Sequence, residues 1–299
     1  AILSGFTIKN GYSIWGGGIS CGYHSNPNIE NVMIVNNSAS DNGGGLYCWE
    51  YSNPTLFNVT IKNNSASSTA GGIYCVNNSN PSLVDVLITG NTAAISGGIH
   101  GNNSSPSLQN VTITNNIVSD NAGGVKFTNN SNPSLVNTIL WNNTFQEISF
   151  SDPQEGDPNT ITIAYSNIQG GQDSIVTNDN GTVTWGDGNI DVDPMFVDTA
   201  NGNYHLLATS QLINGGHPDS TDSDGSRADI GAYPYLNSYS GPTWYITESG
   251  NDTTATGASD DPFRSIQSGI NFSSDDDSVT VAAGTYVENI NFRGRNIKV

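Results

Sequence analysis

The segment SNPSLVDVLITGN at residues 79–91 occurs in five related versions along the first half of the chain. The five copies begin 27, 27, 25 and 27 residues apart. A fixed period of this length is typical of stacked repeat units rather than of one globular core. The other copies are SNPNIENVMIVNN (25–37), SNPTLFNVTIKNN (52–64), SSPSLQNVTITNN (104–116) and SNPSLVNTILWNN (131–143).

Each copy favours β-strands, because it is rich in turn residues and its apolar residues alternate with polar ones. Val111 and Ile113, for example, are separated by Thr112. Three short strands fit in one period, and stacked strands pair about 4.8 Å apart. We therefore predict an all-β fold, a right-handed parallel β-helix (solenoid) with coils of about 27 residues across residues 1–145.

Stacking in register places equivalent residues of successive coils in columns, and three apolar columns are expected to form a narrow core. An Asn column is expected at one corner, because Asn tolerates left-handed backbone and its amide can bond to the next coil. Gly pairs such as Gly71-Gly72 predict a second bend. The apolar columns are Ile29, Leu56, Leu83, Leu108 and Leu135; Ile34, Ile61, Ile88, Ile113 and Leu140; and Leu46, Ile73, Ile99 and Val125. The Asn column is Asn37, Asn64, Asn91, Asn116 and Asn143.

The three cysteines, Cys21, Cys48 and Cys75, share a column of their own, two positions after inward apolar residues. We expect buried thiols that pack as small apolar side chains. A disulfide between adjacent coils is possible in distance, although side chains that stack in parallel are poorly aimed for it, so the disulfide state stays open.

The composition restricts the classes of partner. The chain has 299 residues and a formal net charge of −19, with only eight Lys and Arg. Nucleic acid and anionic membrane surfaces are therefore not expected as partners. No apolar run approaches the length of a membrane span, so no membrane insertion is expected. The first residues, AILSGFTIKNG, already have the pattern of a strand, which predicts a piece of a longer product.

Three domains are predicted: regular coils at 1–145, irregular coils and a closing segment at 146–242, and the start of a following β-helix unit at 243–299. Strand-like runs at Thr160–Tyr165 and Thr182–Trp185 support further coils beyond the repeats. A short capping helix is expected near the C-terminus, with Asp261 as N-cap and Pro262 in the first turn. Its apolar face would hold Phe263, Ile266 and Ile270.

The closing segment, residues 191–235, resembles the choice-of-anchor Q-type segment of secreted bacterial β-helix proteins. The resemblance implies an architecture and no particular chemistry, and the chain departs from the pattern at Pro234. The residues that carry it are Asp193-Pro194, Phe196, Asp198, Tyr204-His205-Leu206, Ile213, Gly216 and Asp229-Ile230-Gly231-Ala232-Tyr233.

Residues 243–299 resemble the N-terminal cap of a right-handed β-helix of the pectate-lyase-like superfamily. This resemblance implies that a strand, a short helix and the first coils of another solenoid follow the closing segment. The matching residues are Val281, Ala283-Gly284-Thr285-Tyr286, Glu288 and Ile290.

No catalytic residues are predicted, although pectate lyases and polygalacturonases share this architecture. A lyase needs a base beside carboxylates that hold calcium, and an inverting hydrolase needs carboxylates on adjacent coils. The only Lys and Arg residues of the repeat region are Lys9, Lys62 and Lys126, and no group of acids is expected to join them. Its acidic residues do not line up; they are Glu30, Asp41, Glu50, Asp85 and Asp120.

Two candidate binding sites remain. Tyr47, Tyr74 and His100 form an outward column that could stack on sugar rings, although Tyr is also a good strand residue. Eight aspartates are dense enough to hold calcium, although a solvated acidic loop is the alternative. They are Asp187, Asp191, Asp193, Asp198, Asp219, Asp222, Asp224 and Asp229.

Together these features predict a structural or adhesive β-solenoid, extracellular or at the cell surface, and not an enzyme. The cap-like segment lies after the closing segment, so we expect one unit of a tandem or head-to-tail filamentous array, with the chain itself as partner. The alternative is a polysaccharide-binding or polysaccharide-degrading protein, either a lyase or a glycoside hydrolase. No cofactor is certain, and calcium is the one candidate.

Overall fold

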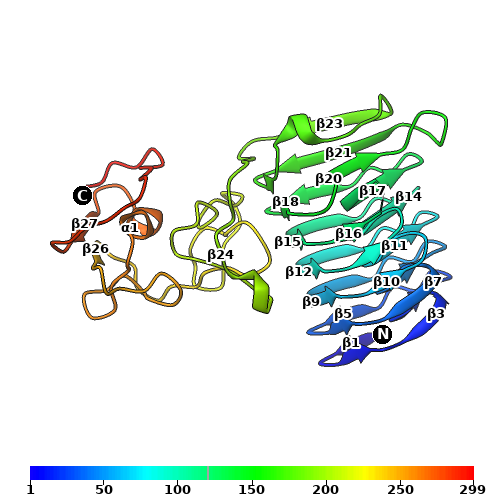
Figure 1. The fold of residues 1–299 in the computed structure, drawn as a ribbon, viewed down its shortest axis with the longest axis horizontal. Helices are drawn as coiled ribbons and strands as arrows, with labels where there is room; N and C mark the ends of the chain where they lie inside the picture. Colours follow the sequence, from blue (N-terminus) through cyan, green and yellow to red (C-terminus); the bar gives the residue numbers. More distant parts are fainter. Residues whose placement is uncertain (120) are drawn as a thin grey trace. The chain divides into compact units, whose positions relative to one another are not determined.

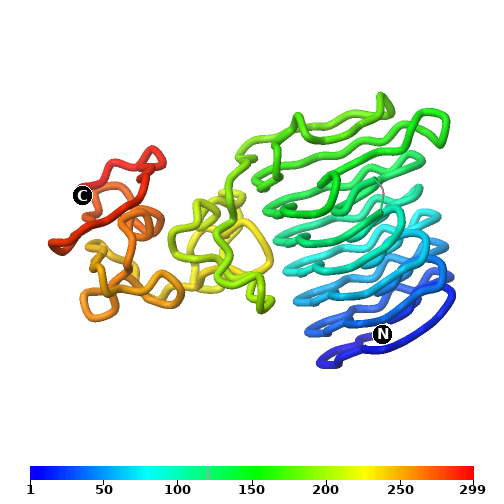
Figure 2. The backbone as a smooth tube through the Cα atoms, in the orientation of Figure 1, coloured from blue at the N-terminus to red at the C-terminus, as the bar shows by residue number. Residues whose placement is uncertain are grey.

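The computed structural model describes residues 1–119 and 121–299 and divides the chain into two units, Ala1–Val192 and Asp193–Val299. Asp120, one of the acidic residues of the repeat region, lies outside the described residues. The backbone of the first unit winds in successive coils, each stacked on the one before (Figure 2). All strand pairs of this unit are parallel among the described residues, so the predicted β-helix is confirmed.

The coils of the first unit build three parallel sheets, whose strands stack one above another in Figure 1. The first sheet holds β1 (Ile2–Ser4), β2 (Thr7–Lys9), β5 (Asn28–Glu30), β6 (Met33–Val35), β9 (Thr55–Lys62), β12 (Ser82–Thr89), β15 (Ser107–Thr114), β18 (Ser134–Val136), β19 (Ile139–Trp141), β21 (Asn159–Ala164), β22 (Asn167–Ile168) and β23 (Gly181–Trp185). The second sheet holds β3 (Tyr12–Trp15), β7 (Ser38–Asn42), β10 (Ser65–Ala66), β13 (Thr92–Ala93) and β16 (Ile117–Val118). The third sheet holds β4 (Ile19–Cys21), β8 (Leu46–Cys48), β11 (Ile73–Val76), β14 (Ile99–Asn102), β17 (Ala122–Thr128) and β20 (Gln146–Phe150).

The three apolar columns form the core of the first unit. Leu83 pairs in register with Leu56 on one side and Leu108 on the other, and all three are buried. The Ile and Leu residues of the other two columns are likewise buried in the same cluster. The glycine bend is tight: a Cβ on Gly72 would lie 2.5 Å from the carbonyl oxygen of Gly98. The side chains that alternate along each strand thus fix which face is inside.

The solenoid continues beyond the regular repeats. β21 pairs with β18, and β23 pairs with β21, so the expected irregular coils are present. Their longer connections include the short 3₁₀ helix η1 (Gln172–Ser174). The first unit, Ala1–Val192, therefore contains both the regular coils of residues 1–145 and the irregular coils that follow them.

The Asn column forms a buried hydrogen-bond ladder, as its spacing predicts. Asn64 Nδ2 donates to Asn91 Oδ1 at 3.0 Å, and the backbone N–H of Asn64 donates to the same oxygen at 2.9 Å. The left-handed backbone, however, lies one residue earlier, at Asn36, Asn63 and Asn115. In each Asn-Asn pair, such as Asn63-Asn64, the first residue makes the turn. The second forms the side-chain hydrogen bonds that the buried backbone groups of the corner need.

The cysteine column lies in the core as expected. Cys48 pairs in register with Cys21 and Cys75, and all three thiols are free and buried. The hydrogen bond with Cys21 lowers the pKa of Cys48, but the bond with Cys75 and then burial outweigh it and raise the pKa, so the sulfur stays protonated.

The second unit contains short elements around a separate small core. They are β24 (Phe196–Asp198), η2 (Thr199–Asn201), β25 (Asn203–Leu206), β26 (Thr243–Ile246), α1 (Ile266–Phe272) and β27 (Ser278–Val281). Trp244, Phe263 and Ile270 are buried at its centre. β26 and β27 pair in parallel, and Lys298 continues this ladder beside Ser278. None of the described helices is long and apolar enough to cross a membrane.

The predicted helix exists, but its start differs from the prediction. It begins at Ile266, with Ser265 as N-cap, so Asp261 and Pro262 lie in the preceding loop. The cause is a distant carboxylate: Glu288 accepts the N–H groups of Ile266 and Gln267 at 2.8 and 2.9 Å. A negative charge at the first turn satisfies two N–H groups that have no partner within the helix.

Candidate ligand-binding site

The predicted aromatic column lies on the outer face of the third sheet. Tyr47 of β8 and Tyr74 of β11 are in register, and their rings stack with centroids 5.6 Å apart. Trp15 stacks on the other side of Tyr47, at 6.3 Å. Because the rings stack on one another, each covers part of its neighbour's face, and the Tyr74 hydroxyl accepts from Asn102 Nδ2 at 3.5 Å. Tyr47 and Tyr74 are therefore half-buried rather than fully exposed.

The expectation of an exposed His100 is wrong. His100 is only 5 % exposed, and its ring meets Tyr74 edge to face with centroids 5.3 Å apart. In register on its other side is Lys126 of β17. The two flanking side chains leave the imidazole little solvent contact, which a strand position alone does not reveal.

At the His100 end, the aromatic column leads into a pocket of about 470 Å³, here named the β14–β17 pocket. Tyr74, His100 and Lys126 form part of its lining. Asp152 and Glu155, from the turn after β20, complete it on another side. No acids were expected near Lys126, but two carboxylates line the same pocket as its side chain. The two carboxylates come from the loop between irregular coils, where no repeat position indicates their place.

His100 is neutral and incompletely bonded. Its Nε2 lies 3.4 Å from Thr128 Oγ1, and its buried Nδ1 has no hydrogen-bond partner among the described residues. Burial, and next the charge of Lys126, lower the pKa of His100 to about 3. An imidazole this acidic in its protonated form is a weak proton acceptor at neutral pH.

The rest of the pocket presents polar groups held by their neighbours. Lys126 Nζ donates to Asn121 Oδ1 at 2.7 Å, and Asn129 Nδ2 donates to Asn102 Oδ1 at 2.7 Å. Burial raises the pKa of the Tyr74 hydroxyl, so Tyr74 remains a neutral donor and acceptor. Such a set of fixed amides, hydroxyls and one ammonium can bind a ligand that is rich in hydroxyl groups.

The candidate calcium residues fall in both units. Asp187 and Asp191 belong to the first unit, and the other six belong to the second. The described residues contain no group of three or more His, Cys, Asp or Glu arranged to hold a metal ion. Two of the eight aspartates already accept local hydrogen bonds. Asp198 accepts the Asn201 N–H at 3.2 Å, and Asp193 accepts the Met195 N–H at 2.9 Å.

Asp229 is the most deeply buried of the eight aspartates. It is 3 % exposed, and its oxygens accept the N–H groups of Asn214 and Tyr235, each at 2.7 Å. Burial, followed by the charge of Asp222, raises the pKa of Asp229 to about 8. The aspartate of the DIGAY pattern therefore ties two distant chain segments together. Calcium binding at the acidic residues stays a prediction.

Comparisons with known proteins cover two parts of the chain. Residues 2–145 match the family model described as a right handed beta helix region. This stretch is a right-handed β-helix. Residues 248–292 match the model described as a protein of unknown function, DUF1565, which spans α1 and the Glu288 that caps it. No curated protein and no solved structure matches the chain.

Proposed function

We propose that the chain is a structural and adhesive β-solenoid that acts outside the cell and holds a polysaccharide on the outer face of its third sheet. The observation that carries this proposal is the Tyr47–Tyr74 column, which leads along successive coils into the β14–β17 pocket. Ring edges with hydroxyl groups, followed by amides and an ammonium, offer hydrogen bonds at regular intervals. A repeating polar ligand such as a glycan fits a surface that repeats at each coil.

Binding without turnover is supported by the state of the pocket groups. His100 has a pKa of about 3 and is buried, so it is poorly suited to proton abstraction. Asp152 and Glu155 are exposed on one turn rather than placed on opposite walls of the pocket. Most of the other polar columns of the solenoid are occupied by ladder bonds between coils.

A glycan array, followed by a depolymerisation assay on every glycan that binds, tests the proposal. The expected result is retention of at least one polysaccharide with no release of fragments. Substitution Tyr74→Ala should weaken retention, because it removes the ring and hydroxyl at the mouth of the pocket. Tyr204→Ala, in the second unit, serves as the control for loss of a tyrosine elsewhere.

A second candidate function is polysaccharide degradation. It is favoured by one observation, the presence of Lys126, Asp152 and Glu155 in the same pocket. Fragment release that Asp152→Asn or Glu155→Gln abolishes would establish this alternative in place of the adhesive function.

We also propose that such units assemble head to tail into a filament. We further propose that the chain belongs to the pectate-lyase-like superfamily and carries a choice-of-anchor Q-type segment. The parallel ladder of β26 and β27 supports a further solenoid. Electron microscopy should show filaments, whereas a monodisperse monomer by light scattering would refute the array.

A further inference from the structure

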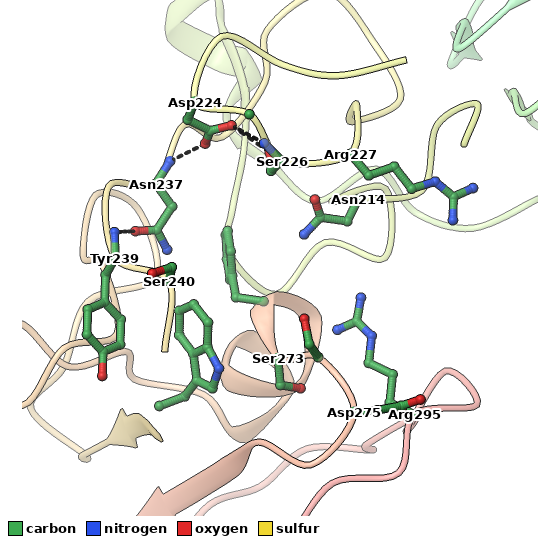
Figure 3. A pocket seen from close by; sticks show the side chains of 14 residues that line it. Asn214, Asp224, Ser226, Arg227, Asn237, Tyr239, Ser240, Ser273, Asp275 and Arg295 are labelled. Carbon is green, nitrogen blue, oxygen red and sulfur yellow. Dashed lines mark hydrogen bonds between the residues drawn. The ribbon is translucent and has the colours of Figure 1, made fainter. Parts of the chain in front are cut away.

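The second unit contains a pocket of about 550 Å³ that the adhesive function does not use. Segments far apart in the sequence line it, from Asn214 through the 224–227 turn to Arg295 near the end of the chain (Figure 3). Phe272 and Trp244 form its apolar side, and serine and asparagine side chains form much of its rim. The volume is that of a site for a small ligand.

Arginine side chains gather at this pocket, although Asp224 and Asp275 also line it. The sequence has only four arginines, and three of them, Arg227, Arg293 and Arg295, interact electrostatically with one another. Arg227 and Arg295 line the pocket directly. Burial, and next the nearby charges of Arg295 and Arg227, lower the pKa of Arg293 to about 10. Like charges brought together in this way destabilise one another, and the charges of Asp229 on Arg293 and of Asp275 and Asp277 on Arg295 offset this only in part.

The guanidinium groups are held in place by backbone carbonyls rather than by acids. Arg293 Nη1 donates to the carbonyl of Ile213 at 2.7 Å, and Arg295 Nη1 donates to the carbonyl of Ile270. Neither of these two arginines forms an ion pair with a carboxylate in the described part of the chain. Since a guanidinium has five N–H groups, most donors of Arg295 are left for a ligand.

The acids that line the pocket are engaged elsewhere. Asp224 accepts the N–H and hydroxyl of Ser226 on one oxygen and the N–H of Asn237 on the other, as the dashed lines of Figure 3 show. Asp275 accepts the N–H of Asn296 at 2.7 Å, although its charge favours the protonated form of Arg295. These bonds hold the carboxylates at the edge of the pocket.

We propose that this pocket binds an oxyanion, a sulfate, phosphate or carboxylate group, at the Arg295 guanidinium, with Arg227 and the Asn214 amide at its rim. Figure 3 shows the Arg295 side chain rising from the C-terminal segment toward Asn214. A planar fork of N–H donors fixed by a carbonyl matches two oxygens of such a group. The site is independent of the β14–β17 pocket, so either can fail without the other.

Isothermal titration of the full chain in chloride buffer at pH 7 and constant ionic strength tests the proposal. The probes are inorganic sulfate, inorganic phosphate and glucuronate, which separate the three oxyanion chemistries. The expected result is saturable binding of at least one probe at one site per chain. Arg295→Gln should weaken it at least about tenfold, because charged hydrogen bonds are lost.

Two further variants keep the test decisive if Arg295→Gln fails to fold. Arg227→Gln changes an exposed side chain and should weaken binding several-fold, whereas Arg264→Gln removes the same charge away from the pocket and should leave binding unchanged. Absence of saturable binding for every probe would overturn the proposal. An equal loss in Arg264→Gln would also overturn it, because the effect would then be general charge attraction.

Discussion

Glu147 closes the buried asparagine ladder at Asn143. One carboxylate oxygen accepts the Asn143 backbone N–H at 3.0 Å, and the other accepts its side-chain amide at 2.5 Å. Glu147 is 5 % exposed, and burial raises its pKa to about 7 in spite of these two bonds. A group that gains protons on folding in this way makes the stability of the first unit depend on pH.

The sign of this pH dependence follows from the direction of the shift. The folded chain binds a proton on Glu147 that the unfolded chain releases above pH 4.5, so stability falls as pH rises from 4.5 through about 7. His100 acts oppositely, because its lowered pKa costs stability as pH falls below 6.5. We predict that wild type gains about 2 kcal/mol relative to Glu147→Gln between pH 7.5 and pH 5.

Denaturant unfolding of wild type and of Glu147→Gln across this pH range measures the difference between their free energies of unfolding. The contribution of His100 is the same in both proteins and cancels in that difference. A difference that does not change with pH would show that the Glu147 carboxyl titrates normally.

The asparagine ladder itself should be a main source of stability. Asn91→Ala leaves two N–H donors of Asn64 without the oxygen that they share, and both are buried. We expect a loss of about 3 kcal/mol in the free energy of unfolding, because buried donors without acceptors cost more than exposed ones. Asn53→Ala is the matched control, since Asn53 makes a similar bond between coils at an exposed position. Equal losses in the two variants would contradict this account.

The three thiols should be unreactive in the folded chain. Cys21, Cys48 and Cys75 are buried, and the pKa of Cys21 and Cys48 is raised, so little thiolate is present. Iodoacetamide followed by mass spectrometry should find no label in the native protein and three labels after unfolding in denaturant. Rapid labelling of the native protein would show that the core opens around these coils.

The density of carboxylates in the second unit predicts that this unit binds calcium. Removal of bound calcium by EGTA at constant ionic strength should then lower the unfolding temperature of that unit, since a ligand of the folded state stabilises it. Magnesium added in place of calcium should not restore the temperature, because it prefers a smaller octahedral site. If EGTA leaves the unfolding temperature unchanged, the prediction of calcium binding is wrong.

The solenoid could be predicted from the sequence because its information is local and repeated. Apolar residues equivalent to Leu83 and Ile88 occur in each regular coil, so their inward direction follows from alternation along the strand and stacking between coils. The helix start could not be predicted, because the capping carboxylate of Glu288 lies 22 residues beyond Ile266. For the same reason the position of Asp152 could not be predicted, since only the path of a loop outside the repeat brings it into the pocket that Lys126 lines.

The burial of His100 had a weaker signal in the sequence. Its column places Tyr on one neighbouring coil and Lys on the next, and two long side chains can cover the ring between them. The degree of cover depends on how those side chains lie, which strand alternation does not fix.

The adhesive function is tested most directly by parallel measurement of glycan retention and fragment release with the full chain. Wild type is expected to retain a polysaccharide and to release no fragments. Tyr74→Ala combined with Lys126→Gln should weaken retention at least about tenfold through lost hydrogen bonds. Release of fragments by wild type, abolished by Glu155→Gln, would contradict the adhesive function.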